Sequence, residues 1–178
     1  MTGAQGTEPA GLARRLSATV YEALVLTALL LAVGFLLLPL VTPGPDVPGG
    51  NLQSHYLMSS RSRPWSGVAL FAVCGAYCAG LWSGGRRTLP MKTWRLWLRA
   101  SDGRNVAASA AIARYLACWV GPALALGAYA ALYPFGHGRW ALALLALNYA
   151  WALVDRDRQF LQDRIAGTRL LVETRERG

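Results

Sequence analysis

The chain has 178 residues, enough for one compact unit, and a net charge of +9. Hydrophobic residues make up 54% of the chain and charged residues only 15%, against about 25% in soluble domains. The arginines lie beside apolar stretches and form no stripe on a soluble domain, so the composition argues against nucleic-acid binding.

Four long stretches contain no Asp, Glu, Lys or Arg, namely 23–41, 64–85, 115–138 and 140–154. Apolar stretches of about 20 residues are typical of membrane-spanning helices. They predict an all-α membrane protein with four transmembrane helices at about 16–41, 65–83, 107–133 and 139–155. Residues 14–172 are expected to form one transmembrane domain, between a flexible segment 1–13 and a tail 173–178.

The first stretch follows Arg14 and Arg15, so a cleaved signal peptide is an alternative. Signal peptides have a short apolar region and end at a small-residue cleavage site. Here the uncharged region extends over 23–41 and contains Pro39 near its end, without an Ala-x-Ala pattern. These features favour a retained helix.

Trp65 and Trp82 frame the second predicted span, and indole rings prefer the headgroup level of a bilayer. Small residues recur at every fourth position, at Ala72, Ala76, Gly80 and Gly84, a pattern that favours close packing of helices within the chain.

The third predicted span contains Pro122, which leaves a backbone carbonyl near Cys118 without its helical donor, so we expect a kink. A tight turn at 133–138 should lead into the fourth span. Asn148 within that span should form an interhelical hydrogen bond. A three-span alternative buries Arg139.

Of the 18 Lys and Arg residues, 15 lie in the amino-terminal segment, in 83–114 and in the carboxyl-terminal tail. Positive residues concentrate on the cytoplasmic side of inner-membrane proteins. Both termini and the 83–114 connection should therefore be cytoplasmic, and the 42–64 connection external. Arginines at the cytoplasmic face should attract anionic lipid.

Two segments outside the predicted spans have sequences typical of β-strands. Apolar and basic residues alternate over 93–99, and 169–174 is rich in β-forming residues. We predict that they pair as a cytoplasmic β-ribbon near residues 97 and 171. The alternative for 90–99 is an amphipathic helix in the interface. Residues 155–165 should prolong the fourth helix and end at Gly167.

Glu22 is an acid inside the first predicted span, where an ionised group costs about 2.5–3.5 kcal/mol. It shares a helix face with Arg15, seven residues before it, and Arg114 at the start of the third span is a second candidate partner. Glu22 is either a proton or cation site or a residue that ties two helices together.

Cys74, Cys78 and Cys118 fall inside predicted spans, where packing is the usual role of a free cysteine. Asp155, Asp157 and Asp163 could hold a divalent ion, but interfacial mixed charges are usually solvated. No catalytic, phosphate-loop or metal-ligand spacing occurs, so no enzyme activity, metal or cofactor is expected.

Two segments resemble the RDD family of bacterial membrane proteins, named for an arginine and two aspartates. The first is 15–22, in which Arg15 matches the arginine and Glu22 occupies the first aspartate position. The second is 162–170, in which Asp163 matches the second aspartate. Arg114 matches an arginine that opens the next span, whereas 85–90 departs from the family's glycine-containing pattern.

The resemblance implies a multi-pass inner-membrane protein, and transport including cation exchange has been suggested for members. On this reading Glu22 binds a cation or proton, Arg15 or Arg114 tunes its affinity, and Asp163 fastens the tail. Four helices make a thin wall, so transport would require a homo-oligomer. The alternative is an accessory or scaffold protein that organises a partner complex or lipid and transports nothing.

Overall fold

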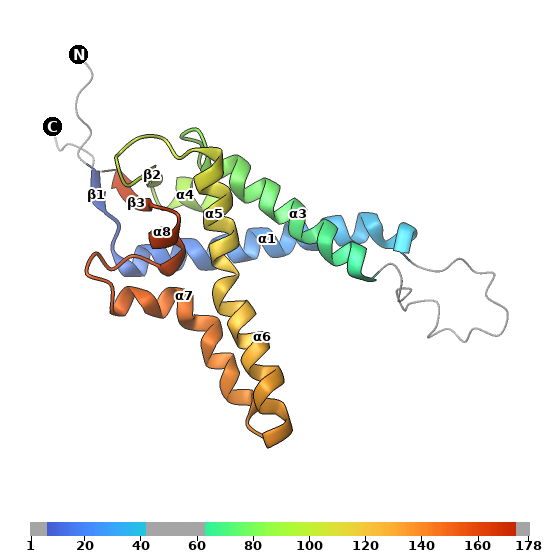
Figure 1. Cartoon of the computed structure of the whole chain (residues 1–178). Coiled ribbons are helices and arrows are strands. Elements are labelled where there is room, and N and C mark those ends of the chain that lie inside the picture. The colour runs from blue at the N-terminus through green and yellow to red at the C-terminus, as the bar shows by residue number, and fades with distance from the viewer. Residues whose placement is uncertain (1–6, 42–62, 174–178) are drawn as a thin grey trace, which may run out of the picture.

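The computed structural model describes residues 7–41 and 63–173 (Figure 1). The predicted external connection 42–64 and the predicted tail 173–178 therefore lie almost entirely outside the described residues. The described chain is mainly helical, with one small β-sheet near the two ends of the chain. We call this part of the molecule the sheet end.

The first two apolar stretches form helices α1 (Leu12–Val41) and α3 (Arg63–Trp82), which lie side by side. Neither helix has an acid in its first turn or a base in its last turn. A helix satisfies every backbone hydrogen bond internally, which suits an apolar sequence without water around it. Large apolar side chains stay exposed along α1, among them Phe35 at 76%.

The third stretch forms two helices, α5 (Ala108–Cys118) and α6 (Val120–Leu132), which meet at Trp119. The kink predicted from Pro122 is therefore present, three residues before the proline. The predicted turn is also confirmed, because a short 3₁₀ helix η1 (Tyr133–Phe135) precedes Gly136 with a φ of 73°.

The fourth stretch is not one helix. It consists of η2 (Gly138–Ala146), α7 (Leu147–Ala150) and η3 (Trp151–Leu153), of which the first and last are 3₁₀. The stretch returns along α6, against which η2 packs (Figure 1). Three helices of the described chain are long and apolar enough to cross a membrane: Leu12–Leu38, Trp65–Trp82 and Ala108–Phe135.

The predicted ribbon is confirmed and has a third strand. Strand β2 (Leu96–Ala100) pairs antiparallel with β3 (Thr168–Glu173), and Trp97 lies opposite Leu171. Strand β1 (Thr7–Pro9) pairs with the other edge of β3, giving the order β1-β3-β2. The prediction that all of 1–13 is flexible is therefore wrong for the described residues, because three of them are held in a sheet.

A short helix, α4 (Leu89–Thr93), precedes β2. Thr88 caps it, since its hydroxyl accepts a hydrogen bond from the Met91 amide at 3.5 Å. The interfacial helix considered for 90–99 thus covers only the first part of that segment, and the strand covers the rest.

The prediction that 155–165 prolongs the fourth helix is wrong. Asp155 Oδ2 accepts hydrogen bonds from the amides of Asp157 at 3.1 Å and Gln159 at 3.0 Å, which closes a turn. The chain then starts a separate short helix, α8 (Leu161–Ile165). Gly167 follows α8 with a φ of 61°, in agreement with its predicted capping role.

The core lies where α1, α3 and α5 meet the sheet, around the fully buried Leu96 and Leu98 of β2. Trp82 belongs to this core and is only 6% exposed, so its ring packs inside the protein and is not an anchor that faces the headgroups; Trp65 is 73% exposed. The small-residue stripe was also misread, because Ala72 and Ala76 are exposed.

Candidate functional site: a buried charge network beside an apolar cavity

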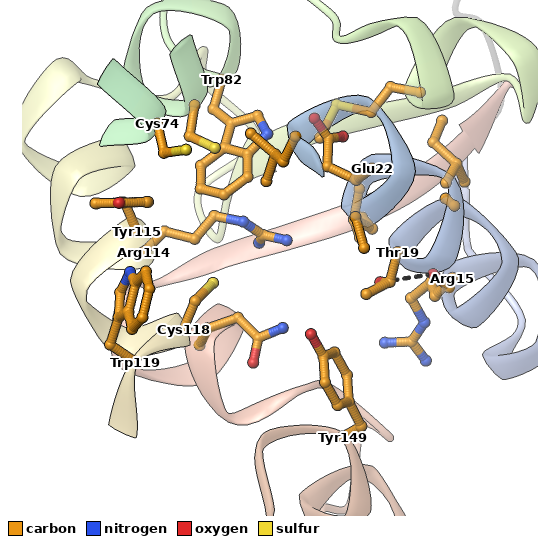
Figure 2. Close-up of a pocket in the computed structure, with 18 of the residues that line it drawn as sticks. Arg15, Thr19, Glu22, Cys74, Trp82, Arg114, Tyr115, Cys118, Trp119 and Tyr149 are labelled. Carbon is orange, nitrogen blue, oxygen red and sulfur yellow. Dashed lines mark hydrogen bonds between the residues drawn. The ribbon is translucent and has the colours of Figure 1, made fainter. Parts of the chain in front are cut away.

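A cavity of about 350 Å³ lies between α1, α3, α5 and the start of α6 (Figure 2). Its wall is mostly apolar, from residues such as Leu26 and Leu30 of α1 and Trp119 and Pro122 opposite. Toward the sheet end the lining becomes polar and includes Arg15, Glu22, Arg114, Tyr149 and Gln162. The cavity therefore combines an apolar wall with charged groups at one end.

Glu22 projects from α1 into this cavity, and α4 supplies its hydrogen-bond donor. The Thr88 hydroxyl donates to Oε2 at 2.7 Å, while Oε1 is buried without a hydrogen-bond partner among the described residues. The Tyr77 hydroxyl lies within reach for a longer hydrogen bond to this carboxylate, and Arg114 interacts with it electrostatically. Within residues 7–41 and 63–173, no ion pair joins Glu22 to either predicted partner, Arg15 or Arg114.

Arg114 instead forms an ion pair with Asp163 of α8, and both side chains are almost fully buried. Thr168 of β3 completes the group, because its hydroxyl accepts from Arg114 Nη1 at 3.1 Å and donates to Asp163 Oδ1 at 3.4 Å. The guanidinium also lies 4.9 Å from the ring centroid of Trp82. Arg114 of α5 thereby joins α8 and β3, which are neighbours in sequence, to the end of α3.

Arg15 is 5% exposed and lies on the same side of α1 as Glu22, as the spacing of seven residues predicted. Its guanidinium lies 5.3 Å from the ring centroid of Phe160, and its Nε has no hydrogen-bond partner among the described residues. Asp155 interacts with it electrostatically. Arg15 is thus a buried cation whose Nε–H donor is unpaired among the described residues.

All three cysteines line the same cavity, Cys74 and Cys78 from α3 and Cys118 from α5. In the part of the chain that the structure describes, no group of three or more His, Cys, Asp or Glu side chains is arranged to hold a metal ion.

The structure thus brings Arg15, Glu22 and Arg114 to one cavity. Asp163 does not line this cavity and reaches it only through its ion pair with Arg114. Sequence reasoning missed Thr88 as the partner of Glu22. A signal was present, because a threonine two residues before a proline, as in Thr88-Leu89-Pro90, is typical of a helix start.

A family model, described as the RDD family, matches residues 9–167 of the chain. Searches of curated proteins and of solved structures each found no significant match. The matched region contains the first resembling segment, residues 162–167 of the second, and all four predicted site residues. Together with the long apolar helices, the match shows a membrane protein, and the chain belongs to the RDD family.

Proposed function

We propose that this protein moves a small cation or a proton across the membrane, with Glu22 as the binding site. The observation that carries the proposal is the buried Glu22 carboxylate on the cavity wall, which has no ion-pair partner among the described residues because Arg114 pairs with Asp163. Gln162 Oε1 is a further buried oxygen on the same cavity wall. Ionisable residues inside membranes commonly belong to ion pathways, and oxygen atoms are suitable cation ligands.

The other site residues have supporting roles in this proposal. Arg114 and Arg15 tune the affinity of Glu22, because a nearby cation favours the ionised carboxylate and opposes a bound cation. Asp163 neutralises Arg114 and fastens α8 and β3 to α5. None of these groups is assigned a catalytic role.

The proposed topology has four spans in the inner membrane, with both termini and the 83–114 connection in the cytoplasm. The fourth span is η2, α7 and η3, which returns along α6 and contains no charge from Trp140 to Val154. A 3₁₀ helix rises about 2.0 Å per residue against about 1.5 Å in an α-helix, so the uncharged part of these segments reaches about 26 Å. That length is close to the hydrocarbon thickness of about 30 Å.

Transport by Glu22 is tested with purified protein in liposomes that contain a pH-sensitive dye. We expect proton flux that depends on Na⁺, and Glu22→Gln should abolish it while the protein stays folded and inserted. Glu8→Gln removes an exposed acid outside the spans and is the matched control. Absence of any cation- or pH-dependent flux from correctly inserted wild-type protein would contradict the proposal. Crosslinking of the same liposomes tests the proposed homo-oligomer.

The second candidate is an accessory protein that holds a partner or lipid and transports nothing. The sealed Arg114–Asp163–Thr168 group supports it, because a fully buried ion pair suits a fixed structure. Under this alternative Glu22→Gln lowers the amount of folded protein in the membrane, and the wild type gives no flux.

A further inference from the structure

A second cavity, of about 380 Å³, lies at the sheet end outside the Glu22 site. It is formed by the junction of β1 with α1, by the 156–159 turn and by β3. Four arginines and one aspartate line it: Arg15, Arg156, Arg158, Arg169 and Asp157. The aspartate is already paired, with Arg164 at 3.2 Å and Arg169 at 3.6 Å. The lining therefore has a surplus of positive charge.

One of these arginines is built into the wall. Arg15 is 5% exposed, yet its Nε has no hydrogen-bond partner among the described residues. Asp155, the acid that acts on it, has Oδ2 engaged by two backbone amides. A buried guanidinium with an unpaired donor favours an acceptor nearby, because an unpaired buried donor is destabilising.

The amino terminus of α1 opens on the same cavity. Gly11 and Leu12 line it, and the first intrahelical hydrogen bond runs from the Arg15 amide to the Gly11 carbonyl at 3.2 Å. The preceding amides of the helix have no intrahelical acceptor. Gly11 has no side chain to cap them, and the first turn of α1 contains no acid. This 30-residue helix thus directs its positive dipole end toward the arginines.

We propose that this cavity binds a phosphate-type oxyanion, held by Arg15, Arg156, Arg158 and the free amides of α1. Guanidinium groups match the geometry of phosphate oxygens, and backbone amides at a helix start add neutral donors. The anion is either free phosphate or the phosphate of an anionic lipid headgroup, since the same chemistry recognises both. The site does not depend on transport by Glu22.

The test uses the whole protein in phospholipid-free detergent. Inorganic phosphate is titrated by calorimetry, and in a separate arm retention of phosphatidylglycerol is compared with that of phosphatidylcholine by native mass spectrometry. Arg156→Gln with Arg158→Gln should weaken the binding at least tenfold. Lys92→Gln with Arg95→Gln is the matched control: it removes the same charge, and Arg95 has a positive φ of 53°, close to the 51° of Arg158. It should change the binding less than twofold.

Gly11→Asp is the second variant, and it separates binding from folding. A Cβ at Gly11 meets nothing within 4 Å, and an aspartate there would cap the free amides with its own carboxylate. The variant should raise thermal stability while it abolishes binding. Phosphate binding lost in both variants assigns a free-phosphate site, and lost phosphatidylglycerol retention without phosphate binding assigns a lipid site. Binding in neither arm, or equal binding by the arginine variant and its control, overturns the proposal.

Discussion

The side chain of Asn148 donates a hydrogen bond to the backbone carbonyl of Cys118 at 2.8 Å. This carbonyl would accept from residue 122 in a regular α-helix, but Pro122 has no N–H to give. The same Nδ2 also donates to the Ala117 carbonyl at 3.0 Å. One polar side chain from α7 thus supplies hydrogen bonds to two carbonyls at the break between α5 and α6.

Asn148→Ala should lower the free energy of unfolding by about 0.6–2 kcal/mol, the range for interhelical hydrogen bonds in membranes. Pro122→Ala supplies the missing N–H from within the helix, so it should restore part of that loss in the Asn148→Ala protein. Unfolding in mixed micelles, followed by circular dichroism, measures both effects. If Pro122→Ala changes the free energy of unfolding by the same amount with and without Asn148→Ala, the two residues do not share this carbonyl.

Gly121→Ala should separate α6 from η2. A Cβ at this position would lie 2.9 Å from the backbone carbonyl oxygen of Leu144, which cannot move without shifting η2. We expect a loss of about 1–3 kcal/mol, as for overpacked cores. Gly127→Ala is the control in the same helix, because its Cβ meets nothing within 4 Å and alanine favours a helix. Thermal melting in detergent compares the two; equal melting temperatures would refute the close approach.

Asp163→Asn should destabilise the protein by about 3–5 kcal/mol, because it leaves the buried Arg114 without a compensating charge. Replacing both partners, Arg114→Met with Asp163→Leu, should recover much of the loss. Asp157→Asn breaks only half-exposed ion pairs and should cost at most about 1 kcal/mol. Chemical unfolding in micelles gives the three values. A loss for Asp163→Asn no larger than that for Asp157→Asn would contradict the buried pair.

Cysteines at positions 97 and 171 should form a disulfide readily, because Trp97 and Leu171 lie opposite each other across β2 and β3. The experiment needs a background in which Cys74, Cys78 and Cys118 are replaced. The pair 97 and 170 is the control, since a shift by one residue places the side chains on opposite faces of the sheet. Electrophoresis after proteolysis between the strands detects the crosslink. Crosslinking of the control pair alone would show a different register.

The sequence predicted best where one physical effect dominates. Uncharged stretches predicted the candidate spans at 65–82 and 108–135, and a period of two over 93–99 predicted the strand that forms β2 at Leu96–Ala100. The roles of Pro122 and Asn148 were predicted separately, because a proline in a helix leaves one carbonyl without a donor and an asparagine in a span seeks hydrogen-bond partners. Their meeting at the Cys118 carbonyl required the fold.

Prediction failed where long-range packing decides. Strand β1 has three residues, one of them Pro9, so no period could be read from it. Trp82 was read as a lipid-facing anchor from residue type, although its ring is buried in the core beside the Arg114 guanidinium. The partner of Arg114 was missed because the turn at 155–160 brings Asp163 back toward α5, and that turn depends on hydrogen bonds of Asp155.

The order β1-β3-β2 also has a consequence for biosynthesis. The middle strand is the last described element to leave the ribosome, so neither outer strand has a neighbour to pair with while the helices enter the bilayer. Arg114 likewise emerges well before Asp163, and until then its ion-pair partner is missing. The sheet can therefore form only late, after the helices of the chain have inserted into the bilayer in the correct arrangement.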